Sequence, residues 1–153
     1  MTDFDSVVEI ESMTKTKLEI VRVFDAPVET VYRAWIDAEI LKCWMGPGEV
    51  SCKEASAEVR VGGSYRIHMQ DPDCEQHIVT GVYSEIAVNS RLSFSWQWEG
   101  SESTTHVSVE FKPLDGGKTE LTLRHSGFPD QVARDHHHQG WNGCLENLAK
   151  ALN

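Results

Sequence analysis

The chain has 153 residues, a net charge of −10 at pH 7, 40% hydrophobic residues and 25% charged residues. This length and composition are typical of one globular domain. The negative charge argues against nucleic acid and anionic membranes as partners, because both are bound through clusters of Lys and Arg.

The cysteines and the N-terminus bear on the cellular compartment. None of the four cysteines forms a C-x-x-C pair, and the N-terminal segment is acidic, without the apolar core of a signal peptide. No stretch approaches the ~18 apolar residues of a membrane-spanning helix. We therefore expect a cytoplasmic protein with reduced thiols and no membrane span.

The N-terminal part of the chain divides into a tail and a first strand. Residues 1–16 are polar and acidic without a clear period, which predicts a flexible acidic tail, so that residues 17–153 form a single domain. Lys17 to Asp25 predicts a strand. Its apolar residues change face between Ile20 and Val21, which is explained by a bulge or by burial on both faces.

A short helical segment follows this strand. Pro27 occupies a favoured first helical position, and the helix is expected to end near Asp37. Residues 38–44 predict a second short helix, and residues 45–48 a loop. The first helix carries one apolar stripe, made of Val28, Val31, Tyr32 and Trp35.

Alternating residues then predict six strands. The clearest period of two places Leu92, Phe94 and Trp96 on one face. Gly62-Gly63 predicts a hairpin turn. The expected strands cover residues 50–61, 65–70, 77–85, 92–98, 107–111 and 119–125. In the first of them, Ala55, Ala57, Val59 and Val61 should share a face.

The last segment predicts a long amphipathic helix. At about 100° per residue, one side of this helix carries His137, Trp141, Cys144, Leu145, Leu148 and Leu152. The helices are separated in sequence from the strands, which indicates an α+β fold. We expect a curved antiparallel sheet of about six or seven strands wrapped on this helix, with a cavity between them.

Several short motifs together resemble a known family. They include Ala34-Trp35, Trp44 through Pro47, Gly62-Gly63-x-Tyr65, Arg91-Leu92-x-Phe94-x-Trp96 and Gly140-Trp141-x-x-x-Leu145. This ordered set resembles the activator of Hsp90 ATPase C-terminal-like family, within the START/Bet v 1-like (polyketide cyclase/lipid transport) superfamily. The resemblance implies a helix-grip fold over an apolar cavity for a hydrophobic ligand. It implies no universal catalytic residues.

Eight residues are expected to line this cavity. His125 continues the apolar face of the last strand, either as a hydrogen-bonded core residue or as a polar group that orients a ligand. The aromatic residues fit a core and a cavity wall equally well. The expected lining is Trp35, Tyr65, Met69, Trp96, Trp98, His125, His137 and Trp141.

The final helix contains two further features. His136, His137 and His138 point about 100° apart and cannot converge on one ion, so we expect no metal site and no cofactor. By angle, His137 and His138 flank the apolar stripe, whereas His136 points outward. Gly140 and Gly143 are explained by a closely packed loop or second subunit, or by a helix that flexes over the cavity.

The sequence thus favours a protein that binds a small hydrophobic, aromatic or lipid-like molecule, and favours a non-enzymatic role. One alternative is a polyketide cyclase/aromatase-like enzyme, with His125 in acid–base chemistry. Another is a single-domain Hsp90 co-chaperone-like module in stress response, with a chaperone as protein partner. The sequence leaves open whether the protein forms a homodimer.

Overall fold

The computed structural model describes residues 17–152 and shows an α+β fold. The elements are β1 (Lys17–Phe24), α2 (Val28–Ile36), α3 (Ala38–Trp44), β2 (Ser51–Ala57), β3 (Ser64–Gln70), β4 (Gln76–Ala87), β5 (Arg91–Trp98), β6 (Thr105–Leu114), β7 (Lys118–Ser126) and α4 (Gln131–Ala151). The predicted order of elements is confirmed. The predicted acidic tail, residues 1–16, lies outside the described residues.

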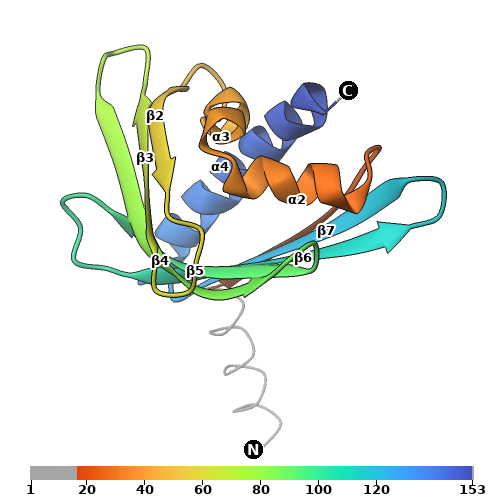
Figure 1. Cartoon of the computed structure of the whole chain (residues 1–153). Helices are drawn as coiled ribbons and strands as arrows, with labels where there is room; N and C mark the ends of the chain where they lie inside the picture. Colours follow the sequence, from red (N-terminus) through yellow and green to blue (C-terminus); the bar gives the residue numbers. More distant parts are fainter. Residues whose placement is uncertain (1–16, 153) are drawn as a thin grey trace, which may run out of the picture.

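The seven strands form one antiparallel sheet in the order β1-β7-β6-β5-β4-β3-β2. Figure 1 shows that the sheet curves around α4 and that α2 and α3 lie on the same, concave side. Helix α3 contacts α4 and β2, whereas α2 contacts β6 and β7. This is the predicted helix-grip arrangement, in which the apolar side of α4 is buried between the concave face of the sheet and α3.

The irregular period of β1 has neither of the two causes expected from the sequence. Its pairing with β7 is continuous, so there is no bulge. Leu18 and Ile20 are buried, whereas Val21 is 53% exposed on the outer face. The inward position that follows is Arg22, whose guanidinium donates to Asn142 Oδ1 on α4 over 3.1 Å. A polar tie to the helix therefore replaces an apolar contact.

Strand β2 is shorter than the sequence predicts. It ends at Ala57, and the chain then turns through residues 58–63 instead of continuing to Val61. A Cβ on Gly63 would lie 2.1 Å from the Glu58 carbonyl oxygen, so the turn closes too tightly for any other residue. Val59 and Val61 therefore do not share a strand face with Ala55 and Ala57, as the sequence predicted, and are exposed.

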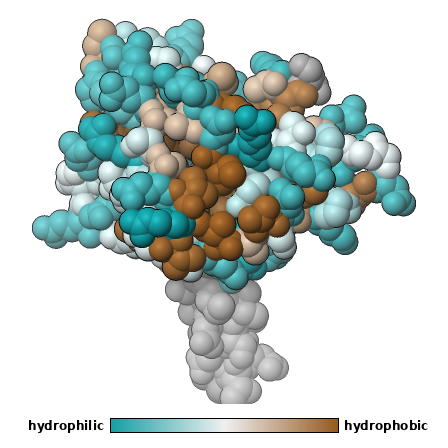
Figure 2. Space-filling model, in the orientation of Figure 1, coloured by the Kyte–Doolittle hydropathy of each residue, from teal (hydrophilic) through white to brown (hydrophobic). Residues whose placement is uncertain are grey.

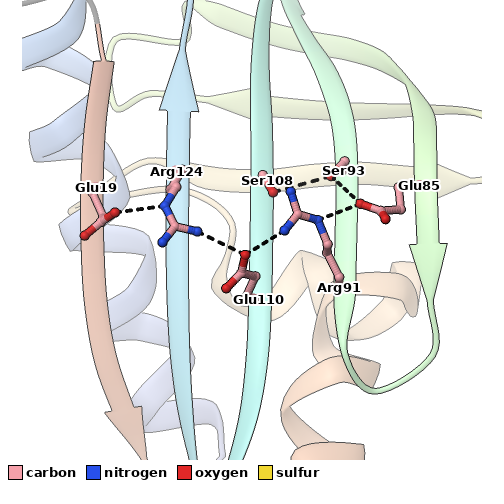
Figure 3. A network of polar contacts seen from close by, with 7 residues as sticks. All are labelled: Glu19, Glu85, Arg91, Ser93, Ser108, Glu110 and Arg124. Atoms are coloured by element: carbon pink, nitrogen blue, oxygen red, sulfur yellow. Dashed lines mark hydrogen bonds and ion pairs between the residues drawn. The ribbon is translucent and has the colours of Figure 1, made fainter. Parts of the chain in front are cut away.

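The convex face of the sheet carries a row of alternating charges across five neighbouring strands (Figure 3). Arg124 pairs with Glu19 at 2.8 Å and with Glu110 at 3.1 Å. Arg91 pairs with both Glu110 and Glu85 at 2.6 Å. Since all five side chains are partly exposed, each pair contributes at most about 1 kcal/mol.

The face of the molecule displayed in Figure 2 carries both hydrophilic and hydrophobic residues. Figure 2 shows one apolar region in the middle of the displayed face, surrounded by hydrophilic residues. Exposed Val61 and Val82 are adjacent in the fold, because Gly62 N–H donates to the Tyr83 carbonyl oxygen. Within residues 17–152, no helix combines the length and the apolar character that crossing a membrane requires.

Candidate functional site

Helix α4 forms one wall of the candidate site. Asp130 caps its N-terminus, where the carboxylate accepts a hydrogen bond of 2.8 Å from Ala133 N–H. The predicted apolar stripe is buried from Trp141 to Leu148, while His137 is half-buried at the N-terminal end. The buried part fixes the helix on the sheet, and the part around His137 borders a cavity.

An outer chamber of about 310 Å³ lies between α4, the sheet and the loop after α3. Five of the eight residues expected from the sequence line it: Met69, Trp96, Trp98, His137 and Trp141. Five further residues that were not expected as lining residues complete the wall, namely Met45, Pro47, His136, Gly140 and Cys144. Cys144 belongs to the predicted stripe, but no period in the sequence indicates that the loop residues Met45 and Pro47 face a cavity.

A much smaller inner chamber of about 20 Å³ adjoins the outer one, since both are lined by Met45 and Trp96. The predicted residues Trp35 and Tyr65 line this chamber, together with Tyr83. Its volume fits one oxygen atom or one water molecule but no ring. Burial raises the pKa of Tyr83 to about 12, so its hydroxyl stays neutral.

His125 lines neither chamber and is fully buried beneath Trp141. Trp141 Nε1–H donates to His125 Nδ1 over 3.0 Å, which leaves Nε2 as the protonated nitrogen. This Nε2–H donates to Thr105 Oγ1 over 2.6 Å, and the Thr105 hydroxyl donates to the Trp96 carbonyl oxygen over 3.0 Å. The arrangement satisfies every polar atom of a neutral imidazole.

The protonation state of His125 follows from this burial. Loss of solvation lowers its pKa from the ordinary 6.5 to about 2, and the neighbouring His137 and His106 act in the same direction. A neutral His125 with both nitrogens bonded cannot exchange a proton with a molecule in either chamber near pH 7. Its geometry is that of a core residue that orients Trp141.

His137 and Trp98 lie together at the rim of the outer chamber. Trp98 Nε1–H donates to His137 Nε2 over 2.8 Å, and His137 Nδ1–H donates to the Ala133 carbonyl oxygen over 2.7 Å. Burial lowers the pKa of His137, which keeps it neutral and able to accept from Trp98. This bond ties α4 to β5 at the entrance.

The orientation expected for His136 and His138 is only partly correct. His136 is exposed but also lines the chamber, whereas His138 lies near Asn142 and does not line it. The reason is that the chamber opens toward the loop at Pro47, which is the side of α4 that carries His136 and Gly140.

The same loop explains Gly143. A Cβ on Gly143 would lie 2.7 Å from Pro47 Cβ, so the loop packs directly on the helix backbone. Asn147 Nδ2–H donates to the Gly46 carbonyl oxygen over 2.9 Å and fixes the loop there. Of the explanations left open by the sequence, close packing of a loop is the one observed.

One group of metal-ligating side chains lies outside the chambers. Ligand atoms of Asp71, Glu75 and His77, at the turn between β3 and β4, are within 4.8 Å of one another. Asp71 Oδ2 accepts from His77 Nε2 over 2.9 Å, and this bond is the main cause of the lowered pKa of Asp71. This hydrogen bond by itself accounts for the proximity of Asp71 and His77.

The comparisons with known proteins agree with this geometry. Residues 25–153 match the family described as Activator of Hsp90 ATPase homolog 1-like protein. A crystal structure of a protein from Chromobacterium violaceum superimposes with a TM-score of 0.84 at 26% identity, covering 90% of this chain and 96% of that one. A protein from Nitrosomonas europaea gives 0.79 at 24% identity, with 91% and 95% covered.

A crystal structure described as an Hsp90 activator from Plasmodium falciparum gives a TM-score of 0.71 at 21% identity, with 90% of this chain and 96% of that chain covered. At 21% identity, this similarity shows that the two proteins share a fold. No curated protein sequence matches the chain.

Proposed function

The chain belongs to the Activator of Hsp90 ATPase homolog 1-like family, and we propose that it binds a small, largely apolar molecule in the outer chamber. The observation that carries the proposal is the chamber itself. It has about 310 Å³ of space, the size of a small-ligand site, and its walls include Met69, Trp96, Trp98 and Trp141. Indole rings in these walls offer flat apolar surfaces to an aromatic or lipid-like ligand.

The polar contacts within the site favour a ready-made cavity. Trp98 and Trp141 are held by hydrogen bonds to His137 and His125, so their rings are positioned before a ligand arrives. Preorganised walls reduce the entropy that binding costs. Apolar contact would supply most of the affinity, with the histidines near the rim as the accessible polar groups.

The test uses N-phenyl-1-naphthylamine, a neutral dye whose fluorescence rises in apolar surroundings. Gly140 lines the chamber, and the nearest atom to an added Cβ is Pro47 Cγ at 3.9 Å, so Gly140→Phe places a ring at the entrance without a backbone clash. Glu146→Phe is the matched control, because Glu146 is on the exposed side of the same helix.

We expect the dye to bind the unmodified protein and Glu146→Phe with equal affinity, and Gly140→Phe at least about tenfold more weakly. Circular dichroism checks that both variants are folded. Equal affinity in all three proteins, or no binding to the unmodified protein, would contradict the proposal. Native mass spectrometry of protein from its own host would identify a co-purified molecule and show whether the protein is a homodimer.

The cyclase-like alternative required His125 as an acid or base. His125 has no free ring nitrogen and lines neither chamber, so this mechanism receives no support from the geometry. The observations favour binding over turnover.

A partner module is the second candidate, supported by the description of the family and by the likeness in fold to the Hsp90 activator from Plasmodium falciparum. The exposed valines beside Gly62 offer an apolar surface for a protein partner. Purified Hsp90 from the source organism is the direct test. Binding that Val61→Glu weakens would support this role, whereas no binding and no change in ATPase rate would remove it.

The proposed location is the cytoplasm. All four cysteines are free thiols, and Cys43 and Cys74 are exposed, which fits a reducing compartment. Fractionation of the source cells tests this.

A further inference from the structure

The five tryptophans differ in what their indole N–H groups contact. Three donate within the protein: Trp44 to the Ala34 carbonyl oxygen, Trp98 to His137 and Trp141 to His125. Among residues 17–152, the N–H groups of Trp35 and Trp96 have no hydrogen-bond partner, although both atoms are buried. A buried donor without a partner destabilises the protein by about 1–3 kcal/mol, so two of them in one site require an explanation.

Both donors belong to the same site. Trp35 and Trp96 are 4% and 5% exposed, and both line the inner chamber. Trp141 stacks on Trp35 with ring centroids 5.8 Å apart and tilts against Trp96 at 5.0 Å. Trp35 and Trp96 therefore both contact Trp141, whose ring also borders the outer chamber.

No described atom of the protein accepts a hydrogen bond from these two indole N–H groups. No charged side chain lines the inner chamber. Its two hydroxyl groups belong to Tyr65, which donates to the Ser95 carbonyl oxygen over 2.5 Å, and to Tyr83, and neither hydroxyl accepts from an indole N–H of Trp35 or Trp96. The chamber, about 20 Å³, has room for one oxygen atom, while a ring system fits only in the adjoining outer chamber. An anion there would be desolvated without a cation beside it, which favours a neutral oxygen.

We infer that the ligand carries a neutral acceptor oxygen, a ketone or ether type, which enters the inner chamber and accepts from Trp35 Nε1–H or Trp96 Nε1–H, while its apolar ring system fills the outer chamber. This inference rests on the proposed function and adds the class and the orientation of the ligand. The polar end points inward, and the apolar body lies between α4 and the sheet.

The test compares two probes of the same shape. 2-Acetylnaphthalene carries a ketone oxygen, and 2-isopropenylnaphthalene has a CH₂ group in its place. Proton–nitrogen correlation spectra of the unmodified protein resolve the indole N–H groups, which Trp→Phe variants assign. The ketone should bind about tenfold more tightly and should shift the N–H resonances of Trp35 or Trp96 downfield, whereas the hydrocarbon should not shift them downfield.

Variants separate the two donors from general packing. Trp35→Phe and Trp96→Phe should each reduce the preference for the ketone, to about threefold or less where that N–H is the main donor. Trp44→Phe is the control, because Trp44 lines neither chamber and its N–H is already bonded. The Trp44→Phe variant should prefer the ketone over the hydrocarbon as strongly as the unmodified protein does. Where a variant does not fold, the spectra of the unmodified protein decide.

The outcomes distinguish the two proposals. Equal affinities for both probes, with the resonances of Trp35 and Trp96 unmoved by the ketone, would overturn the inference and leave the proposed function standing; a single resident water would then be the acceptor. Binding of neither probe would count against the proposed function and the inference together.

Discussion

Acidification is expected to destabilise this protein through His125. The imidazole is fully buried and neutral, with Nδ1 accepting from Trp141 and Nε2 donating to Thr105. Burial lowers its pKa from 6.5 to about 2 in the folded state. In the unfolded state the same side chain has its ordinary pKa of about 6.5 and takes up a proton below that pH.

The pKa of His125 differs between the folded and the unfolded state, and this difference fixes the direction and the size of the pH effect on stability. Below pH 6.5 the unfolded state binds a proton that the folded state does not, so the free energy of unfolding decreases as the pH falls. The stabilising contribution is fully present above pH 6.5 and decreases by up to about 1.4 kcal/mol per pH unit below it. Between about pH 7.5 and about pH 5.0 the loss amounts to about 2 kcal/mol. His137, whose pKa burial also lowers, adds to the loss in the same direction.

Urea denaturation at the two pH values measures the effect. His125→Gln should lower the stability by about 1–3 kcal/mol at about pH 7.5, because it disturbs two buried hydrogen bonds. At about pH 5.0 its deficit against the unmodified protein should be about 2 kcal/mol smaller, because the substitution removes most of the pH dependence. His136→Gln is the control, since His136 is exposed and should leave the pH dependence intact. The reasoning would be refuted if His125→Gln lost as much stability on acidification as the unmodified protein.

Three further predictions concern packing, charge and thiol reactivity. Gly143→Ala should cost about 1–3 kcal/mol, because its Cβ would lie 2.7 Å from a loop atom, whereas Gly140→Ala should raise stability by up to about 1 kcal/mol; thermal unfolding that shows the same sign for both would contradict the loop contact. Glu110→Gln should cost less than about 1 kcal/mol at low salt and nothing measurable at ~1 M salt, which urea denaturation tests; a larger loss that salt does not reduce would refute a surface contribution. Burial raises the pKa of Cys144 to about 11, so at about pH 8 iodoacetamide should modify it at least about a hundredfold more slowly than exposed Cys43, and equal rates by mass spectrometry would show that the chamber opens.

The sequence predicted the elements best where one face carries a regular apolar pattern. Leu92, Phe94 and Trp96 alternate on β5, and the structure buries all three. The stripe on α4 is likewise buried from Trp141 to Leu148. Such patterns depend only on the period of the backbone, so they can be recognised without knowledge of tertiary contacts.

What the sequence could not predict depends on contacts between distant segments. Arg22 interrupts the apolar face of β1 because it reaches Asn142, 120 residues away. The position of Pro47 against Gly143 likewise has no counterpart in any local pattern. The sequence could also not decide between a core role and a ligand-orienting role for His125, because the choice depends on bonds to Trp141 and Thr105 that only the fold creates.

The polar contacts of α4 bear on how a ligand would enter. Arg22 ties the middle of the helix to β1, Trp98 ties its N-terminal part to β5, and Asn147 ties its C-terminal half to the loop at Gly46. Displacing the whole helix would break all three contacts, whereas opening the rim at His137 would break the bond between Trp98 and His137 and leave the other two in place. Entry at the rim is therefore the route of lowest cost. A ligand that enters there would meet the apolar walls of the outer chamber first and the inner chamber, lined by Trp35 and Trp96, last. Under the inference above, selection for an acceptor oxygen would then take place at the end of the path.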